Sequence, residues 1–318
     1  MTGLAPGTDY DVSIGRRRAG TVRTLVPPPG RELYRFATVN DVHIGERAFG
    51  FRRTIREKGV TVPYPVRCLR AALDEAQEWG AQRIVVKGDL TDLGRPPEFA
   101  TVAEELARVD APVDVVLGNH DIGRRKSNGV PVLVGAGLHV ATDPTAIDVP
   151  GLRIVLAPTA HPPLGRGHVP PTIRQEILEL IRGAGTPVLV AVHHYPQRWR
   201  FATNWPPGIP GNEAQPLLDA IDRTSPGAVF VSGHSHRHRL HRHGTLRVAE
   251  LGSTKDFPGT WAGYVVYEGG IRQVVRRVAE PSAIEWTDRT RRTLFGLWGL
   301  WSPGTLEGRC WSHEWPSV

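Results

Sequence analysis

The feature that most constrains this chain is a set of five short polar motifs, each placed directly after an apolar run. The apolar runs cover residues 34–39, 83–86, 113–117, 188–192 and 228–231. Runs of this length, rich in valine and isoleucine, are typical of buried strands. The motifs after them are Asp41-Val42-His43, Gly88-Asp89-Leu90-Thr91-Asp92, Gly118-Asn119-His120-Asp121, Val192-His193-His194 and Gly233-His234-Ser235-His236. Because open α/β sheets place their sites at the carboxyl ends of strands, we expect these polar side chains to converge.

The donor types in these motifs indicate what such a site would bind. Aspartate, asparagine and histidine supply oxygen and imidazole nitrogen without thiolate, a set that suits divalent Mn, Fe, Zn or Co. The chain has 2 cysteines, Cys68 and Cys310, which make no disulfide framework. Cys68 lies in a helical pattern, and we expect it to be a core residue. The motifs therefore predict a transition-metal site.

The order of the motifs resembles the calcineurin-like metallophosphoesterase superfamily. That family reads Asp-x-His, Gly-Asp-x-x-Asp, Gly-Asn-His-Asp or Glu, a later strand-end His, and Gly-His-x-His, and the resemblance covers roughly residues 31–279. It implies an α/β fold, a four-layer α-β-β-α sandwich of two mixed sheets flanked by helices. It also implies a metal-dependent phosphoric ester hydrolase in which two divalent ions polarise the phosphoryl group and activate water as hydroxide for attack.

The resemblance implies a ligand for each ion. Asp89 would bridge both. The ligands of one ion would be Asp41, His43 and His236, and those of the other Asn119, His193 and His234. His193 and His194 compete for one position, and we favour His193 because apolar residues lead directly into it; His194 would then lie near the substrate mouth.

Other residues are expected to serve the substrate. His120 would face it, to stabilise the transition-state charge or to protonate the leaving oxygen. Asp121 would orient the His120 ring, and Asp92 would give similar support. Arg52 and Arg53, in a basic loop between the first motif and the next helix, are candidates for contact with a phosphate group.

The resemblance says less about which substrate is hydrolysed than about the reaction. Asp92 stands where purple acid phosphatases carry a tyrosine, which argues against a ferric-tyrosinate enzyme. The His193-His194 pair is similar to the bacterial phosphodiesterase branch, so we expect a phosphodiesterase on a small or cyclic-nucleotide-like substrate. The alternatives are a phosphomonoesterase or a nuclease of the superfamily, a non-catalytic binding scaffold, or a secreted multidomain protein. A net charge of +7 is compatible with phosphorylated substrates; without DNA-binding domains, nucleic acid is not the expected partner.

The chain divides into three predicted parts: residues 1–30, 31–279 and 280–318. The first holds an expected β-hairpin and a proline linker, and it resembles the last two strands of a fibronectin type III-like domain, as purple acid phosphatases also carry. It is either a remnant of a domain that continues upstream or a hairpin that packs on the catalytic domain. The last is rich in tryptophan, and we expect its indoles to fill grooves on the sandwich.

The remaining patterns concern helices, spare histidines and location. Helical spacing predicts helices over 65–76, 97–106 and 171–181. We expect His238, His241 and His243 to lie in a solvated hairpin turn. No apolar stretch approaches a membrane span, and the start lacks a signal peptide, so the sequence as written predicts a cytoplasmic protein; a true start upstream would allow an extracellular one. The oligomeric state is left open.

Overall fold

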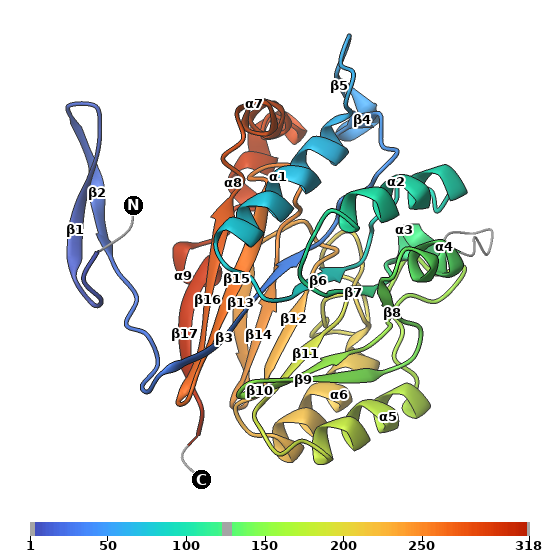
Figure 1. The fold of residues 1–318 in the computed structure, drawn as a ribbon, viewed down its shortest axis with the longest axis vertical. Helices are drawn as coiled ribbons and strands as arrows, with labels where there is room; N and C mark the ends of the chain where they lie inside the picture. The colour runs from blue at the N-terminus through green and yellow to red at the C-terminus, as the bar shows by residue number, and fades with distance from the viewer. Residues whose placement is uncertain (1–3, 123–128, 317–318) are drawn as a thin grey trace.

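Two mixed sheets face each other at the centre of the computed structural model, which describes residues 4–122 and 129–316, and helices cover both outer faces (Figure 1). Valine, leucine and alanine side chains from both sheets fill the space between them, with Phe36 stacked on Tyr264 in this central core. The predicted four-layer α-β-β-α sandwich is confirmed.

The first sheet has seven strands in the order β17-β16-β15-β3-β6-β7-β8. Its parallel part is β3 (Glu32–Val39), β6 (Ile84–Lys87), β7 (Val113–Val116) and β8 (His139–Ala141). The antiparallel part is β15 (Thr260–Tyr267), β16 (Gly270–Arg277) and β17 (Cys310–Glu314). The apolar runs before the first three motifs are therefore strands, as predicted, and the structure places them side by side and parallel.

The second sheet has six strands in the order β13-β14-β12-β11-β10-β9. Its parallel strands are β10 (Leu152–Leu156), β11 (Val188–Ala191), β12 (Val229–Ser232) and β14 (Leu246–Glu250). Antiparallel strands close both edges, β9 (Thr145–Val149) and β13 (Arg239–His243). The last two motifs follow β11 and β12, which confirms the remaining predicted strands.

The outer layers are amphipathic helices that bury one face each. Helices α1 (Tyr64–Glu78), α2 (Pro96–Leu106), α4 (Val130–Gly135) and α7 (Pro281–Thr290) cover the seven-stranded sheet, and α5 (Pro171–Arg182) and α6 (Gly211–Thr224) cover the six-stranded sheet. Short elements complete the description: β4 (Ala48–Phe49), the 3-10 turn η1 (Phe51–Arg53), β5 (Ile55–Arg56) and α3 (Asn119–Ile122). The three predicted helices correspond to α1, α2 and α5.

The N-terminal hairpin is present as β1 (Asp9–Ile14) and β2 (Arg17–Arg23), which form a two-stranded sheet of their own. It stands apart from the sandwich in Figure 1. The linker after it is held to the sandwich, since Ser312 Oγ donates to the Val26 carbonyl at 2.6 Å and Arg31 pairs with Glu268 at 2.8 Å. The kinship of the hairpin with fibronectin-like domains stays a prediction.

The C-terminal tail continues from α7 through the 3-10 turn η2 (Leu294–Gly296), α8 (Leu297–Trp301) and α9 (Leu306–Arg309) into β17. It thus adds an edge strand to the seven-stranded sheet. Trp286 and Trp311 are buried. Within the described residues, none of the helices combines the length and apolar character that crossing a bilayer requires.

The expected solvated turn at the spare histidines is wrong for His238. This side chain is buried, and its Nδ1 accepts a hydrogen bond from the Gly252 amide at 3.1 Å. The tail covers it, because the His238 amide donates to the Ser302 carbonyl at 3.0 Å. His241 and His243 lie on the edge strand β13.

Candidate metal centre

The five motifs meet because strands of both sheets end at the same edge of the sandwich. The loops after β3, β6 and β7 come from one sheet, and those after β11 and β12 from the other. Main-chain hydrogen bonds join the loops: the Asp41 amide donates to Gly88 O at 3.0 Å, and the Gly233 amide to His193 O at 2.9 Å. The site is therefore built on the rigid ends of packed strands.

The backbone at this edge is held in an unusual conformation. Left-handed φ values between 51° and 67° occur at Asp41, His43, Asp89, His234 and His236. Non-glycine residues rarely adopt this region, and such strain concentrates at functional sites. Here the conformation occurs directly after β3, β6 and β12, and it is supported by the His43 amide, which donates to Asp89 O at 2.9 Å.

One half of the centre, which we call the His236 half, consists of Asp41, His43 and His236. His43 Nε2 lies 3.3 Å from His236 Nε2, and Asp41 Oδ1 lies 3.5 Å from His236 Nε2. On the far side of the ring, His236 Nδ1 donates to the buried Asp256 carboxylate at 2.7 Å. A carboxylate thus fixes the orientation of this histidine.

The other half, which we call the His193 half, consists of Asn119, His193 and His234. His193 Nε2 lies 3.2 Å from Asn119 Oδ1 and 3.1 Å from His234 Nδ1. The far ring nitrogens donate to main-chain carbonyls, His193 Nδ1 to Lys87 O at 2.8 Å and His234 Nε2 to Pro207 O at 3.2 Å.

Asp89 lies between the two halves. Its Oδ2 is 3.7 Å from His43 Nε2 and 3.3 Å from His193 Nε2, while its Oδ1 accepts the His120 amide at 2.9 Å. Burial opposes ionisation, but the His193 and His120 charges dominate and hold the pKa of Asp89 well below its usual value. Asp89 is therefore a carboxylate placed to face both groups of ligands.

The hydrogen bonds behind the rings, together with the donors in front of them, indicate that a cation fits this site. A carbonyl oxygen can only accept, so the far nitrogens of His193 and His234 carry the protons. Burial opposes protonation of His193, but the Asp89 charge raises its pKa to about 9, so without a metal its Nε2 also carries a proton. That proton lies among the His234 Nδ1 lone pair at 3.1 Å, Asn119 Oδ1 at 3.2 Å and Asp89 Oδ2 at 3.3 Å, and a metal ion can take its place. Groups of possible ligands lie within 4.8 Å of one another on each side of Asp89. This donor set suits divalent transition metals.

His194 occupies a different position from His193. Its Nδ1 lies 2.9 Å from the Thr159 hydroxyl, beyond the edge of the His193 ring. It still belongs to a group of possible ligands with His193 and His234. Only His193 is in reach of both Asp89 and Asn119, so the geometry favours it as a ligand while keeping His194 as a neighbour.

His120 lies at the edge of the centre and lines the adjoining pocket. Its Nδ1 donates to the Asp92 carbonyl at 2.7 Å. This leaves Nε2 as the ring nitrogen that a substrate can contact. The described hydrogen bonds of Asp121 go elsewhere: its carboxylate accepts from the amides of Thr91 and Gly118 at 2.8 Å. Asp121 therefore ties two ligand loops together, and burial, reinforced by the Asp89 charge, raises its pKa to about 6.

The sequence analysis missed two buried lysines beside the ligands. Lys87 donates to Asn40 Oδ1 at 2.7 Å, and Asn40 in turn donates to Asp41 Oδ2 at 2.5 Å. Burial lowers the pKa of Lys87 to about 7. Lys255 pairs with Glu46 at 2.6 Å and lies 3.6 Å from Asp256. Lys87 could have been noticed in the sequence, because a lysine at the end of an otherwise apolar strand is unusual. Nothing in the sequence around Lys255 and Asp256 marked them as part of the site.

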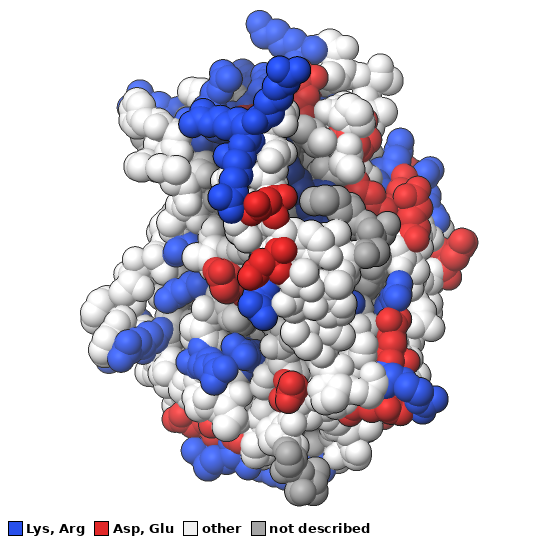
Figure 2. All heavy atoms as spheres, turned by 90° about the vertical axis from the view of Figure 1, so that its left-hand side faces the viewer, with Lys and Arg blue, Asp and Glu red and all other residues white. Residues whose placement is uncertain are grey.

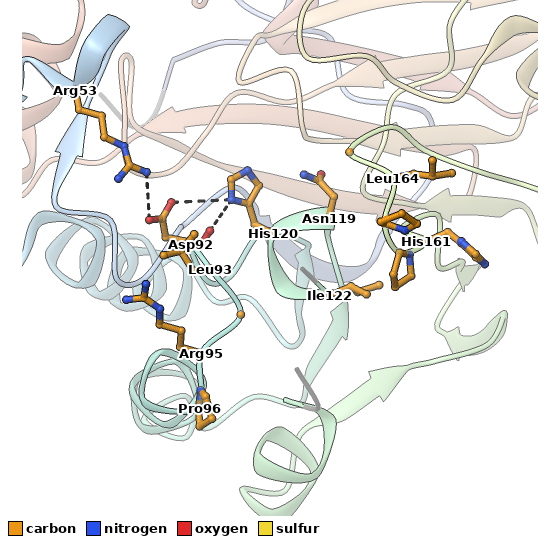
Figure 3. A pocket seen from close by; sticks show the side chains of 14 residues that line it. Arg53, Asp92, Leu93, Arg95, Pro96, Asn119, His120, Ile122, His161 and Leu164 are labelled. Atoms are coloured by element: carbon orange, nitrogen blue, oxygen red, sulfur yellow. Dashed lines mark hydrogen bonds and ion pairs between the residues drawn. The ribbon is translucent and has the colours of Figure 1, made fainter. Parts of the chain in front are cut away.

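A pocket of about 890 Å³ opens beside His120 and Asn119. Figure 3 shows Arg53 and Arg95 on one side of His120, and His161 and Leu164 on the other. Arg53 lies 3.6 Å from the Asp92 carboxylate. The predicted candidate Arg52 lines a separate hollow, whereas Arg95 and His161, which the sequence did not single out, line this one.

A family comparison decides the class. The family model described as calcineurin-like phosphoesterase matches residues 34–238, more than half of the chain. This chain belongs to the calcineurin-like phosphoesterase family. Together with the histidine and aspartate clusters, membership supports a metal-dependent phosphoester hydrolase. No significant match occurs among the curated proteins.

Solved structures agree with this fold. A dimetal phosphatase from Danio rerio shares 17% identity at a TM-score of 0.60, over 79% of this chain and 98% of that one. The purple acid phosphatase PPD1 from yellow lupin shares 10% identity at a TM-score of 0.53, over 87% of this chain and 58% of that one. GAP50, described as the anchor in the inner membrane complex of Plasmodium, shares 12% identity at a TM-score of 0.52, over 80% and 87%. At these identities the likeness concerns the fold alone.

Proposed function

We propose that this calcineurin-like phosphoesterase holds two divalent ions, one in each half of the centre, with Asp89 between them. The observation that supports this most directly is the convergence of donor atoms on His193 Nε2, which lies 3.1 Å from His234 Nδ1 and 3.3 Å from Asp89 Oδ2. When bound, the ions would polarise a phosphoryl group and make water a nucleophile at neutral pH. Mn, Fe, Zn and Co all fit the donor set.

The residues around the centre then serve the substrate. Protonated His120, anchored through Nδ1 to the Asp92 carbonyl, would present its Nε2 proton to the leaving oxygen. Asp121 would keep His120 and Asp89 in register, because it accepts hydrogen bonds from both motif loops. In this proposal His120 provides a proton, while Asp121 positions the loop that carries it.

The pocket supports a phosphodiester as the substrate. A phosphate beside Asn119 and His120 would have room for a group on each side. One side offers the guanidinium groups of Arg53 and Arg95, and the other Leu164 and His161. A diester carries two substituents and suits such a two-sided pocket, whereas a monoester would leave one side unused. The phosphomonoesterase is the alternative.

The test is a substrate panel with the manganese-loaded enzyme, comparing phosphodiesters, phosphomonoesters and cyclic nucleotides. We expect kcat/KM to be highest for a diester that carries an additional anionic group. Arg95→Gln should raise KM for that diester and leave KM for a neutral diester unchanged; Arg108→Gln, an exposed arginine away from the pocket, is the control. Higher kcat/KM for monoesters throughout would refute the diester assignment and leave the hydrolase assignment standing.

The role of His120 can be separated from metal binding. His120→Ala should reduce turnover of esters with poor leaving groups by about 10²–10⁴-fold, the usual worth of general acid catalysis. Activated aryl esters should be affected less, and elemental analysis should find the metal content unchanged. Equal losses on both kinds of ester would mean that His120 acts through charge or positioning instead of proton transfer.

A further inference from the structure

The C-terminal tail carries a surface feature that the hydrolase function does not explain. Four large apolar side chains are exposed on η2 and α8, and we call them the apolar tip: Leu294 at 43%, Phe295 at 104%, Leu297 at 61% and Leu300 at 81% relative exposure. Exposed apolar side chains gathered in this way mark interaction sites more often than ordinary surface.

The backbone projects this tip outward. Leu294 and Phe295 both adopt left-handed φ angles, 54° and 56°, and Gly296 follows at 90°. Two consecutive non-glycine residues in that region are strained, and the strain is offset by the burial of Thr293 and by Trp298, which is partly buried against the core. The indole of Trp298 is hydrogen-bonded to Asp256, so the base of the tip is anchored while its apolar side chains project.

Arginines surround the tip, and we call them the arginine rim: Arg52, Arg56, Arg289, Arg291 and Arg292. Arg52, Arg289 and Arg292 line one hollow with Leu294 and Phe295, so basic and apolar side chains lie side by side there. Arg289 also joins the two segments, since its guanidinium donates to Arg56 O at 2.6 Å. Figure 2 shows Lys and Arg gathered at the top of the face it presents, the end where Figure 1 places β5 and α7.

Basic groups outnumber acidic ones around the tip, where the exposed Glu285 lines a hollow with Arg289. The sequence has no aspartate or glutamate between Asp288 and Glu307. Asp288 itself is paired with Arg277 at 2.9 Å, and Glu57, next to Arg56, is paired with Arg67. The net field around the apolar tip is therefore positive.

We propose that the apolar tip and the arginine rim form a docking surface for an anionic lipid bilayer. Phe295 stands at the border of the hollow that it shares with the arginine rim, and both Phe295 and Leu300 project into solvent, at 104% and 81% exposure, which suits insertion into a fluid interface better than contact with a rigid partner. Basic residues around the inserted groups add attraction to anionic headgroups. The protein would lie on such a membrane through this surface.

The test is co-sedimentation of the full chain with vesicles of phosphatidylcholine mixed with phosphatidylglycerol, and with vesicles of phosphatidylcholine alone. We expect binding to the anionic vesicles that weakens as salt rises, and much less binding to neutral ones. The double variant Phe295→Ser with Leu300→Ser should bind these vesicles at least about tenfold more weakly, because the inserted groups are lost. Arg291→Gln with Arg292→Gln should reduce binding to anionic vesicles only.

Controls keep the outcome specific. Val134→Ser removes an apolar side chain that is 53% exposed on α4, away from the tip, and should bind vesicles like the unaltered protein. All variants should hydrolyse a water-soluble aryl phosphoester at the unaltered rate, because the changed side chains lie outside the pocket. Absent binding to anionic vesicles, or unchanged binding of the Phe295 and Leu300 double variant, would overturn the proposal. So would light scattering that shows a concentration-dependent dimer lost in that variant, since the tip would then join two copies.

Discussion

The two halves of the metal centre hold their histidines in different ways. In the His236 half the acceptor behind the ring is a buried carboxylate, Asp256, at 2.7 Å. In the His193 half the acceptors are the main-chain carbonyls of Lys87 and Pro207. A carboxylate makes an imidazole a stronger donor than a neutral carbonyl does. We therefore expect the His236 half to bind its ion more tightly, and the strand ends to supply two unequal sites.

The largest effect should come from the residue that both halves share. Asp89→Ala should lose both ions, because its Oδ2 lies within 3.7 Å of a ligand nitrogen in each half. Activity should fall by more than about 100-fold, beyond the loss expected for a supporting residue. Elemental analysis after metal loading would measure this.

A matched variant controls for the loss of a buried charge. Asp114→Asn removes the charge of another buried aspartate, one that pairs with Arg83 and His139 outside the centre, and should retain both ions. One ion remaining in Asp89→Ala would show that one half is complete without the bridge.

The next comparison lies within the His193 half. His193→Ala should lose about one ion per chain, because its Nε2 reaches Asp89, Asn119 and His234 together. His194→Ala should retain both ions, since the Nδ1 of His194 is turned to Thr159. Metal stoichiometry of the two variants, measured side by side, checks the assignment. The reverse order would identify His194 as the ligand.

The predicted residues of the centre directly follow strands in the sequence, whereas Asp256, which was missed, reaches the centre from a distant segment of the chain. The strands were predictable because their buried faces require apolar runs such as 188–192. The motif residues follow strands directly, so a strand prediction also places them. Asp256 was missed because it reaches His236 only through the neighbouring position of β14 and β12, and sequence does not give strand order. The prediction for His238 was wrong because the C-terminal tail, much further along the chain, covers it, and sequence does not show where a distant segment packs.

The asymmetry itself can be tested at Asp256. Asp256→Asn should weaken metal binding in the His236 half by about 10–100-fold, because the ring loses its anionic partner. The His193 half should keep its affinity. Titration of the metal-free protein with manganese should therefore show the tighter binding step weakening toward, or past, the step of the His193 half, which stays where it was.

Another aspartate–histidine pair provides the control for Asp256→Asn. Asp219 lies 2.7 Å from His243 on the edge strand β13, so Asp219→Asn removes the same kind of contact away from the centre. Its two metal affinities should match those of the unaltered protein. If Asp256→Asn weakened both halves equally, the two halves would be one coupled site and the contrast between their acceptors would carry no weight.

The smallest effect should come from Trp298, which supports Asp256 from the tail. Its indole N–H donates to Asp256 Oδ1 at 3.2 Å, and its ring packs near His236 and Phe49. Trp298→Phe keeps an aromatic ring and removes the N–H, so we expect the affinity of the His236 half to fall about threefold, within the net worth of one hydrogen bond. Trp286→Phe is the matched control, because its indole donates to the Lys255 carbonyl instead. A loss as large as that of Asp256→Asn would mean that the tail, and not the carboxylate charge, sets the difference between the halves.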